Sequence, residues 1–423
     1  MTAILFAGLA GLLALSVPIA VTLGLSSAVA LQLSGTPLVM LAQSVYEALD
    51  SFGLMAIPFF VLAGTLMQGG GIAQRLVDLA NALVGWIKGG LGACVVLTSM
   101  FFATMSGSSS ATTAAIGSVL IPAMEKKGYP RNLAGAIAAS SGELGVIIPP
   151  SIPMIVYALS ANVSVADLFL AGVLPGLLIG ASLIATVYVL ARMKGFDVVG
   201  ETSLRQWAAN LVTALRRASL AILMPVLILG GIYGGLFTAT EASVVAVVYG
   251  LIVGIYVYKE LRWKDLLPLL GRSAVTSSII LAIVGFAAIF AYILTVNQVP
   301  HKVGAFVTGI SKDPVVFLLA VNVLLFFTGM FMETLAAIII LAPILAPAAM
   351  QYGINPVHFG TVMIVNLAIG MVTPPVGVNL FVVCQVARLR LEQLVRPLLI
   401  FLSVLIVDVL VISYVPALTT WFK

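Results

Sequence analysis

Charged residues are scarce in this sequence. They make up 8% of its 423 residues, whereas 61% are hydrophobic, and the mean hydropathy is +1.20. Soluble domains contain about 25% charged residues, so a soluble fold would have too few charges to cover this much apolar surface. The scarcity excludes a soluble globular protein and predicts a chain that lies almost entirely within a lipid bilayer, with no nucleic acid partner.

Cysteine and histidine are scarcer still, with two of each, and a nucleotide-binding loop is absent. Cys94 and Cys384 lie in apolar segments, which argues against a disulfide framework, and His301 and His358 have no metal-ligand spacing around them. No GxxxxGK[ST] loop is present, which disfavours an ATP-driven pump. A serine nucleophile within 106–110 would lack a base in a matching span. We therefore expect neither an enzyme nor a bound cofactor.

Long apolar runs fill the chain instead. The run from Ile4 to Val21 lacks a charged segment before it and a convincing cleavage site, so we interpret it as a span and not as a signal peptide. Two apolar stretches, 91–124 and 314–350, are too long for one span and carry polar breaks at 106–113 and 329–334, which predicts re-entrant hairpins. Ten full spans are predicted near 3–22, 28–46, 53–69, 131–160, 165–192, 217–236, 241–258, 274–296, 356–386 and 396–418.

The basic residues predict the orientation of these spans. If the N-terminus lies outside, 17 of the 20 lysines and arginines fall inside, and only Lys302, Lys312 and Lys423 fall outside. This distribution agrees with the positive-inside rule only when each hairpin enters and leaves the membrane on its own single side. We therefore predict that both termini are periplasmic and that the amphipathic stretch 71–88 lies along the inner surface.

The two halves of the sequence match each other at a shift of 225 residues. Gly145 recurs as Gly370, and the pair Pro149-Pro150 recurs as Pro374-Pro375. In the predicted topology one hairpin opens inward and the other outward, so the halves are inverted repeats, an architecture typical of secondary transporters. The predicted fold is an all-α polytopic membrane protein with repeats at 1–200 (hairpin 91–124, broken helix 131–160) and 201–423 (hairpin 314–350, broken helix 356–386).

The hairpin tips and proline pairs are the candidate sites for chemistry. A broken helix at mid-membrane leaves carbonyl groups that, with hydroxyls, suit sodium, and half-helix N-termini that suit a carboxylate. A Ser and Gly cluster alone also suits close helix packing, and a single proline pair also suits a kink, but their recurrence favours sites. The predicted sodium ligands are Ser106, Gly107, Ser108, Gly145 and Pro149 in the first half, and Gly329, Glu333, Thr334, Thr373, Pro374 and Gly377 in the second. The predicted solute-binding residues are Ser108, Ser109, Ser110, Pro150, Ser151, Thr334, Thr373, Pro375 and Asn379.

Four acidic residues fall within the predicted spans, where an unpaired acid is costly. Glu143 and Glu333 flank the breaks and are the better functional candidates. Glu241 follows Thr238 at a helix start, which favours a capping role. Asp408 has no partner that the sequence indicates.

The chain resembles the large membrane subunit of tripartite ATP-independent periplasmic (TRAP) transporters over essentially its whole length. The motifs that carry the resemblance are FFATMSGSSSATTAAIGSVLIPAM, GELGVIIPPSIPMIVYAL, GGIYGGLFTATEASVVAVVYGL, FFTGMFMETLAAIIILAPIL and GMVTPPVGVNLFV. The resemblance implies a fold similar to divalent-anion sodium symporters, with a scaffold and an elevator-type transport domain. It also implies sodium-coupled import of a carboxylated solute, such as a C4-dicarboxylate or sialic acid, across the bacterial inner membrane.

The resemblance further implies two protein partners. A periplasmic solute-binding protein would deliver the solute, and a separate small four-span membrane subunit would brace the scaffold. Two alternatives remain open at this stage: a self-sufficient sodium/anion symporter, and a gated anion channel, since polar re-entrant loops also build pores.

Overall fold

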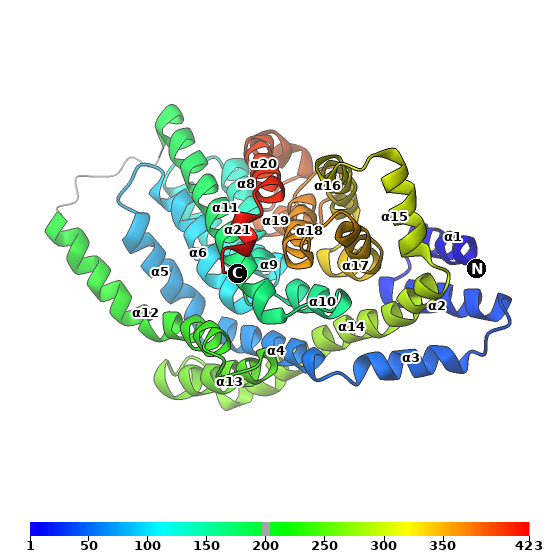
Figure 1. Ribbon diagram of the computed structural model, residues 1–423. Helices are drawn as coiled ribbons and strands as arrows, with labels where there is room; N and C mark the ends of the chain where they lie inside the picture. Colours follow the sequence, from blue (N-terminus) through cyan, green and yellow to red (C-terminus); the bar gives the residue numbers. More distant parts are fainter. Residues whose placement is uncertain (197–203, 423) are drawn as a thin grey trace.

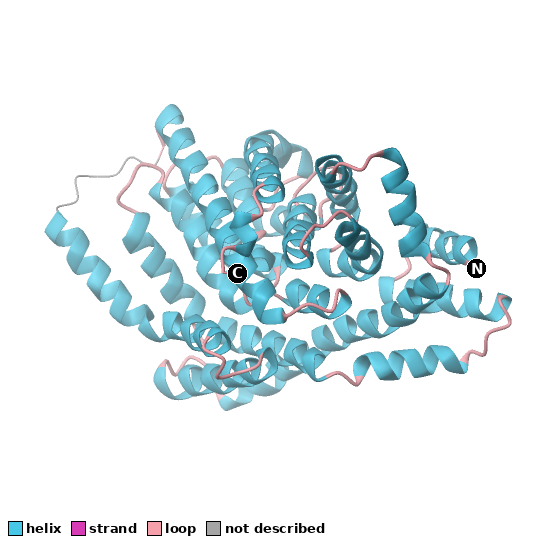
Figure 2. Ribbon diagram, in the orientation of Figure 1, coloured by secondary structure: helices cyan, strands magenta, loops and turns pink. Residues whose placement is uncertain are grey.

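A computed structural model describes residues 1–196 and 204–422 of the chain, and within these residues it consists of helices and loops with no strand (Figures 1 and 2). The elements are α1 (Thr2–Ala14), α2 (Ile19–Leu33), α3 (Val39–Leu49), η1 (Phe52–Met55), α4 (Ala56–Gly69), α5 (Ile72–Val84), α6 (Gly90–Ser106), α7 (Ser109–Lys126), α8 (Arg131–Gly142), α9 (Leu144–Ile147), α10 (Ile152–Ser160), α11 (Val165–Lys194), α12 (Leu204–Tyr233), α13 (Ala239–Ile252), η2 (Val253–Val257), α14 (Trp263–Val296), α15 (Val299–Ile310), α16 (Pro314–Phe331), α17 (Thr334–Gln351), α18 (Pro356–Gly370), α19 (Val378–Ala387), α20 (Leu391–Tyr414) and α21 (Ala417–Thr420).

Several of these helices are long enough to cross a membrane. In the described residues, eight helices are long and apolar enough to cross a membrane, and the number rises to nine if the bent pair 131–147 and 152–160 counts as one span. The longest, α14, has 34 residues and is about 51 Å long at 1.5 Å per residue, more than the hydrocarbon core requires. A polytopic membrane protein is therefore confirmed. Helix length does not decide between spans and re-entrant hairpins, because α16 and α17 pass the same test.

The N-terminal region differs from the two predicted spans 3–22 and 28–46. It forms three shorter helices, because a turn ending at Pro18 separates α1 from α2, and Gly35 (φ +73°) with Pro37 separates α2 from α3. With 13 residues, α1 reaches about 20 Å, which is less than the hydrocarbon core. The prediction of two ordinary spans at these boundaries was wrong because proline and glycine interrupt a continuously apolar sequence.

The predicted hairpins correspond to two helix pairs. In the first hairpin, α6 ends at Ser106 and α7 begins at Ser109, with Gly107 in the left-handed conformation (φ +57°) between them. In the second hairpin, α16 ends at Phe331 and α17 begins at Thr334. α7 and α17 each contain 18 residues and begin 225 positions apart, and the starts of α8 and α18 are also 225 positions apart. The helix boundaries thus follow the shift found in the sequence.

Two predicted helices are broken at their proline pairs. The segment 131–160 bends by 44° between α9 and α10, and α18 is separated from α19 by residues 371–377. Successive prolines have no N–H to donate, so the helix hydrogen bonds cannot continue through them. Both Pro-Pro bonds, 149–150 and 374–375, are cis. We call residues 148–151 the first break and residues 371–377 the second break.

The helices form a long wall with a compact body above it. The wall is built from α4, α13 and α14, with α2 and α3 packed on α14 (Figure 1). In the body, α7 packs on α8 and α19, α8 packs on α20, and α10 packs on α17. Helices of one sequence half therefore contact helices of the other, so the two halves interlock and do not form separate lobes.

Candidate functional site

The first tip (residues 106–110) is organised by its own hydroxyl groups. The Ser106 and Thr112 hydroxyls lie 2.7 Å apart, and the Thr112 hydroxyl donates to the Ser108 carbonyl at 2.8 Å. The Ser108 hydroxyl caps α7 by accepting from the Ala111 N–H at 3.4 Å and lies 3.2 Å from the Ser110 hydroxyl. The tip therefore presents oxygen atoms next to the N-terminal end of an 18-residue helix.

Glycine allows the first tip to lie directly against the first broken helix. A Cβ at Gly145 would lie 2.5 Å from the Thr112 Oγ1 atom and 2.6 Å from the Ser108 carbonyl oxygen. Within the first break, the buried Ser151 donates to the Val146 carbonyl at 2.6 Å, so its hydroxyl replaces a missing helix hydrogen bond. No side chain larger than hydrogen fits at Gly145 without moving the tip.

The second tip (residues 329–334) contacts the second break in the same manner. The Gly377 N–H donates to the Met330 carbonyl at 2.9 Å, and a Cβ at Gly370 would lie 2.6 Å from the Gly329 Cα atom. The buried Thr373 donates back to the Ile369 carbonyl at 2.9 Å. Each tip is therefore in backbone contact with the broken helix of its own half.

The two tips approach each other at Met371. The Thr334 hydroxyl lies 2.9 Å from the Met371 sulfur, and the Ser109 hydroxyl lies 3.8 Å from the same atom. All three residues are buried. One residue of the second broken helix thus joins both tips into a single cluster.

A buried carboxyl group connects the two halves beside this cluster. Glu143, at the junction of α8 and α9, is fully buried and accepts a hydrogen bond from the Asn379 side-chain amide at the start of α19. Their positions in the chain are 236 residues apart. A buried carboxyl group requires such a donor because burial without a partner costs free energy.

Replacing Asn379 with leucine is expected to destabilise the fold by about 3 kcal/mol. Leucine has a similar volume but leaves the Glu143 carboxyl buried without this donor. Thermal unfolding of the detergent-solubilised protein measures the change. Gln385→Leu is the control because Gln385 lies exposed on the same helix. Equal unfolding temperatures for the two variants would show that the Asn379 hydrogen bond contributes little.

A cavity of about 670 Å³ lies between the first tip and the wall. The starts of α7, α10 and α17 reach it with Ser108, Ile152 and Leu335, so three helix N-termini, each with a partial positive charge, border the same space. On the opposite side, α14 contributes Arg272. Glu333 is the one acidic residue among the described lining residues. Helix N-termini together with a guanidinium group favour a bound anion.

The structure divides the predicted site residues into two groups. Those that line the cavity are Ser106, Gly107, Ser108, Ser110 and Glu333. Those buried behind the tips and outside the cavity lining are Ser109, Gly145, Pro149, Pro150, Ser151, Gly329, Thr334, Thr373, Gly377 and Asn379. Pro374 is half-buried and Pro375 is exposed, and neither lines the cavity.

Sequence reasoning missed the wall side of the cavity. Thr65 and Gln68 on α4 and Arg272 and Thr276 on α14 all line it. The signal was present, because each pair is three or four residues apart on an apolar helix and therefore shares one face. Arg272 was counted only among the charges that set the orientation.

The remaining polar candidates have structural partners. Asp408 on α20 accepts from the Ser182 hydroxyl on α11 at 2.5 Å. Glu241 accepts from the Thr238 N–H at 2.8 Å and completes a capping box at the start of α13, as the sequence indicated. His358 is buried, with its ring nitrogens 2.7 Å from the Thr419 hydroxyl and 3.1 Å from the Ser413 carbonyl.

Comparison with known proteins decides the family. The family model described as the tripartite ATP-independent periplasmic transporter DctM component matches residues 6–418. The chain belongs to this family. As a DctM-component protein it is a transporter permease subunit and not an enzyme. Large permeases of this family work with a small membrane subunit and a periplasmic binding protein.

Curated relatives cover nearly all of this DctM-component chain. It is 44% identical over 399 residues to the C4-dicarboxylate TRAP transporter large permease protein DctM of Pseudomonas aeruginosa, covering 94% of this chain and 92% of that protein. It is 43% identical over 420 residues to the isethionate TRAP transporter permease protein DctMQ of Oleidesulfovibrio alaskensis. That match covers 99% of this chain but 66% of the longer relative.

A solved structure shares the fold of this DctM-component chain. The YdaH transporter of Alcanivorax borkumensis superposes with a TM-score of 0.65 at 19% identity, over 88% of this chain and 86% of that one. At this identity the likeness supports the fold alone. The multi-pass helical architecture is therefore common to a transporter that differs widely in sequence.

Proposed function

We propose that this chain is the large permease of a sodium-coupled, binding-protein-dependent importer of small organic acids. The observation that carries the proposal is the convergence of three helix N-termini and Arg272 on one cavity beside the two hairpin tips. A carboxylated solute, such as a C4-dicarboxylate or sialic acid, supplies the negative charge that this cavity favours.

Ser108 and Ser110 of the first tip contact the solute in this proposal, and Gln68, Arg272 and Thr276 face it from the wall. Their hydroxyl, amide and guanidinium groups donate hydrogen bonds that suit carboxylate oxygens. The other predicted solute residues lie behind the tips, apart from the exposed Pro375, and take roles in sodium binding or packing. Arg272 lies on the wall, so its guanidinium attracts the solute only while the first tip faces Arg272.

Sodium binds where each tip touches its broken helix. The first site uses oxygens around Ser106, Gly107, Gly145 and Pro149, and its support is the close approach of the Ser108 carbonyl and the Thr112 hydroxyl to Gly145. The second site uses oxygens around Gly329, Thr334, Thr373, Pro374 and Gly377. Neutral carbonyl and hydroxyl oxygens suit a hard monovalent cation without adding a buried charge.

The protein alternates access by an elevator movement of the two hairpins and broken helices along the wall. A second cavity of about 530 Å³ supports this proposal: it lies farther along the same interface and is lined by Val284 to Thr295 of α14, together with residues of α10 and α17. The repeats 1–200 and 201–423 are inverted, so each can adopt the conformation of the other. When the two repeats exchange conformations, the opening moves from one side of the membrane to the other.

In the proposed orientation both termini are periplasmic, in the bacterial inner membrane, and the first cavity opens to the cytoplasm. The support is the charge distribution, because the basic segment between η2 and α14 precedes the cavity-lining part of α14. Reporter enzymes fused after Lys194 and Lys302 are expected to report opposite sides of the membrane. Reporters that appear on one side would contradict the orientation and the inverted repeat.

Reconstitution tests the function and its partners together. We expect solute accumulation in proteoliposomes only when this chain, its separate small four-span subunit and the loaded binding protein are all present with an inward sodium gradient. Omitting the binding protein should reduce uptake to background, because the loaded partner favours the outward-open state by binding it more tightly. Sodium-driven uptake of free solute without it would instead indicate a self-sufficient symporter, and uptake that never exceeds equilibrium would indicate a channel.

A further inference from the structure

Two adjoining hollows lie between α5 and α12, apart from the solute cavity. The first, of about 610 Å³, lies near the segment that joins η2 to α14 and is lined by Arg75, Arg216 and Arg217. The second, of about 500 Å³, continues along the same two helices and shares Asp78 and Arg217 with the first. Neither hollow contains a residue that lines the solute cavity.

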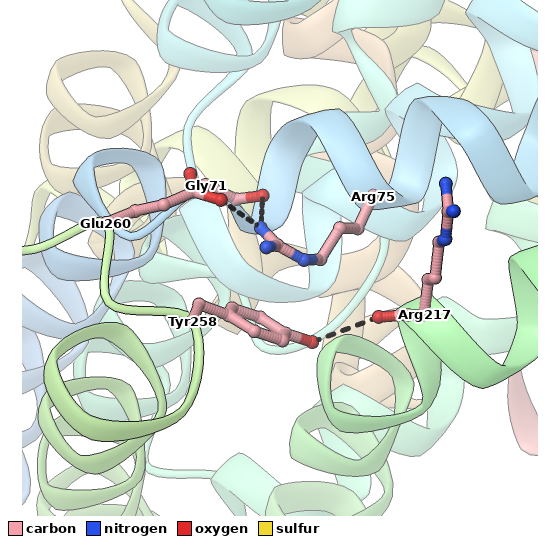
Figure 3. Close-up of polar contacts among 5 residues, drawn as sticks. All are labelled: Gly71, Arg75, Arg217, Tyr258 and Glu260. Atoms are coloured by element: carbon pink, nitrogen blue, oxygen red, sulfur yellow. Dashed lines mark hydrogen bonds and ion pairs between the residues drawn. The ribbon is translucent and has the colours of Figure 1, made fainter.

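One side of the first hollow is fixed by Arg75. Its Nη1 atom lies 2.7 Å from Glu260 Oε1 and donates to the Gly71 carbonyl at 2.7 Å, and its guanidinium lies 3.6 Å from the centre of the Tyr258 ring (Figure 3). The Tyr258 hydroxyl donates to the Arg217 carbonyl at 3.3 Å. Glu260 therefore matches the charge of Arg75, and Tyr258 ties this turn of α12 to the joining segment.

The charges of Arg216 and Arg217 are not matched in this way. Within residues 1–196 and 204–422, neither forms an ion pair, and both side chains are exposed. Ser219, one turn farther along α12, adds a hydroxyl to the same hollow. Asp78 also lines the first hollow and adds one negative charge, so the three arginines, Asp78 and Glu260 together leave a net charge of +1, which favours an anionic group.

The second hollow contains an unsatisfied hydrogen-bond donor. The indole N–H of Trp207 is buried and has no acceptor in the described part of the chain, while its ring packs edge-on against Trp86 with centroids 6.0 Å apart. A buried donor without an acceptor is unfavourable, and a bound acceptor removes that cost. Arg217 lines both hollows, so an anionic headgroup that extends from Arg217 into the second hollow offers oxygens to its guanidinium and to the Trp207 N–H.

The surroundings of the hollows suit a lipid. Leu223 and Val226 follow Ser219 on the same face of α12 and are 41% and 59% exposed, so an acyl chain can lie along them from the level of Arg216. Tryptophan and arginine are typical of the membrane–water boundary, and basic pockets between helices on the cytoplasmic side bind anionic headgroups. We propose that the paired hollows bind the phosphate headgroup of an anionic phospholipid from the adjacent leaflet.

Lipid binding to the purified, delipidated full chain tests the proposal. Native mass spectrometry and thermal unfolding are measured with phosphatidylglycerol, phosphatidylcholine and inorganic phosphate. We expect phosphatidylglycerol to bind at least ten times more tightly than phosphatidylcholine and to raise the unfolding temperature, and inorganic phosphate to do neither. Equal binding of the two lipids, or equal protection by inorganic phosphate, would overturn the proposal.

Two variants and a matched control locate the site. Arg216→Ala combined with Arg217→Ala is expected to reduce phosphatidylglycerol affinity at least tenfold, whereas Lys126→Ala combined with Lys127→Ala removes the same charge elsewhere and leaves affinity unchanged. Trp207→Phe keeps the ring contact with Trp86 but removes the N–H, and is expected to reduce affinity about threefold. Unchanged phosphatidylglycerol affinity in both hollow variants would overturn the proposal. A double arginine variant that no longer binds the small membrane subunit but still binds the lipid would also overturn it.

Discussion

Replacing Ser108 with leucine is expected to reduce sodium-dependent uptake by about 100-fold or more while the protein stays in the membrane. Ser108 caps α7 through its hydroxyl and lines the solute cavity. Leucine removes the cap, which is worth about 1 kcal/mol, and fills space that the solute and its hydrogen bonds require. Uptake in proteoliposomes with the complete transporter measures the loss.

Ser118→Leu is the matched control for this change. Ser118 lies on the same helix, is exposed, and its hydroxyl donates only to the Ala115 carbonyl at 2.9 Å. Ser108→Thr, which keeps a capping hydroxyl, should retain a substantial part of the activity. Full uptake by Ser108→Leu would assign the serine cluster to helix packing and not to solute binding.

Gly145→Ala is expected to raise the sodium concentration that gives half-maximal uptake by about tenfold or more. The added Cβ would lie 2.6 Å from the Ser108 carbonyl oxygen, closer than real Cβ contacts allow, so the first tip must move. If this carbonyl faces a bound sodium ion, a displacement of a few tenths of an ångström weakens coordination. Uptake rates measured across a series of sodium concentrations report the shift.

The control here is Gly271→Ala on α14, where an added Cβ would meet nothing within 4 Å. Sodium dependence of this control should equal that of the natural sequence. Solute affinity measured at saturating sodium distinguishes a weakened sodium site from a weakened solute site in Gly145→Ala. A change in solute affinity alone, with unchanged sodium dependence, would contradict a cation site between the first tip and the first broken helix.

Local features of the molecule were predictable from the sequence, because each has a local cause. The polar break expected at 329–334 lies where α16 (314–331) ends and α17 (334–351) begins, and the proline pairs break the helices where expected. Polar and glycine residues within a long apolar run, and prolines without N–H groups, determine these positions. The N-terminal boundaries were missed because the apolar composition continues through the turns at Pro18 and Pro37.

The complete site was less predictable because it depends on tertiary packing. Both tips were found, but their division into a cavity face and a buried face follows from how each tip lies on its broken helix. Arg272 reaches the cavity only because α14 packs beside α4, and no local pattern indicates that packing. The pairing of Glu143 with Asn379 joins two helices far apart in the chain and could not be read from either segment.

That pairing also orders the events of biosynthesis. Asn379 leaves the ribosome 236 residues after Glu143, which at ordinary synthesis rates is a delay of roughly 10–50 s. During this interval the Glu143 carboxyl lacks the Asn379 donor, so its burial costs more free energy than in the complete chain, which favours hydration of this position or its shielding by the insertion machinery. The polar pairing beside the two tips is therefore completed only after α19 has been synthesised.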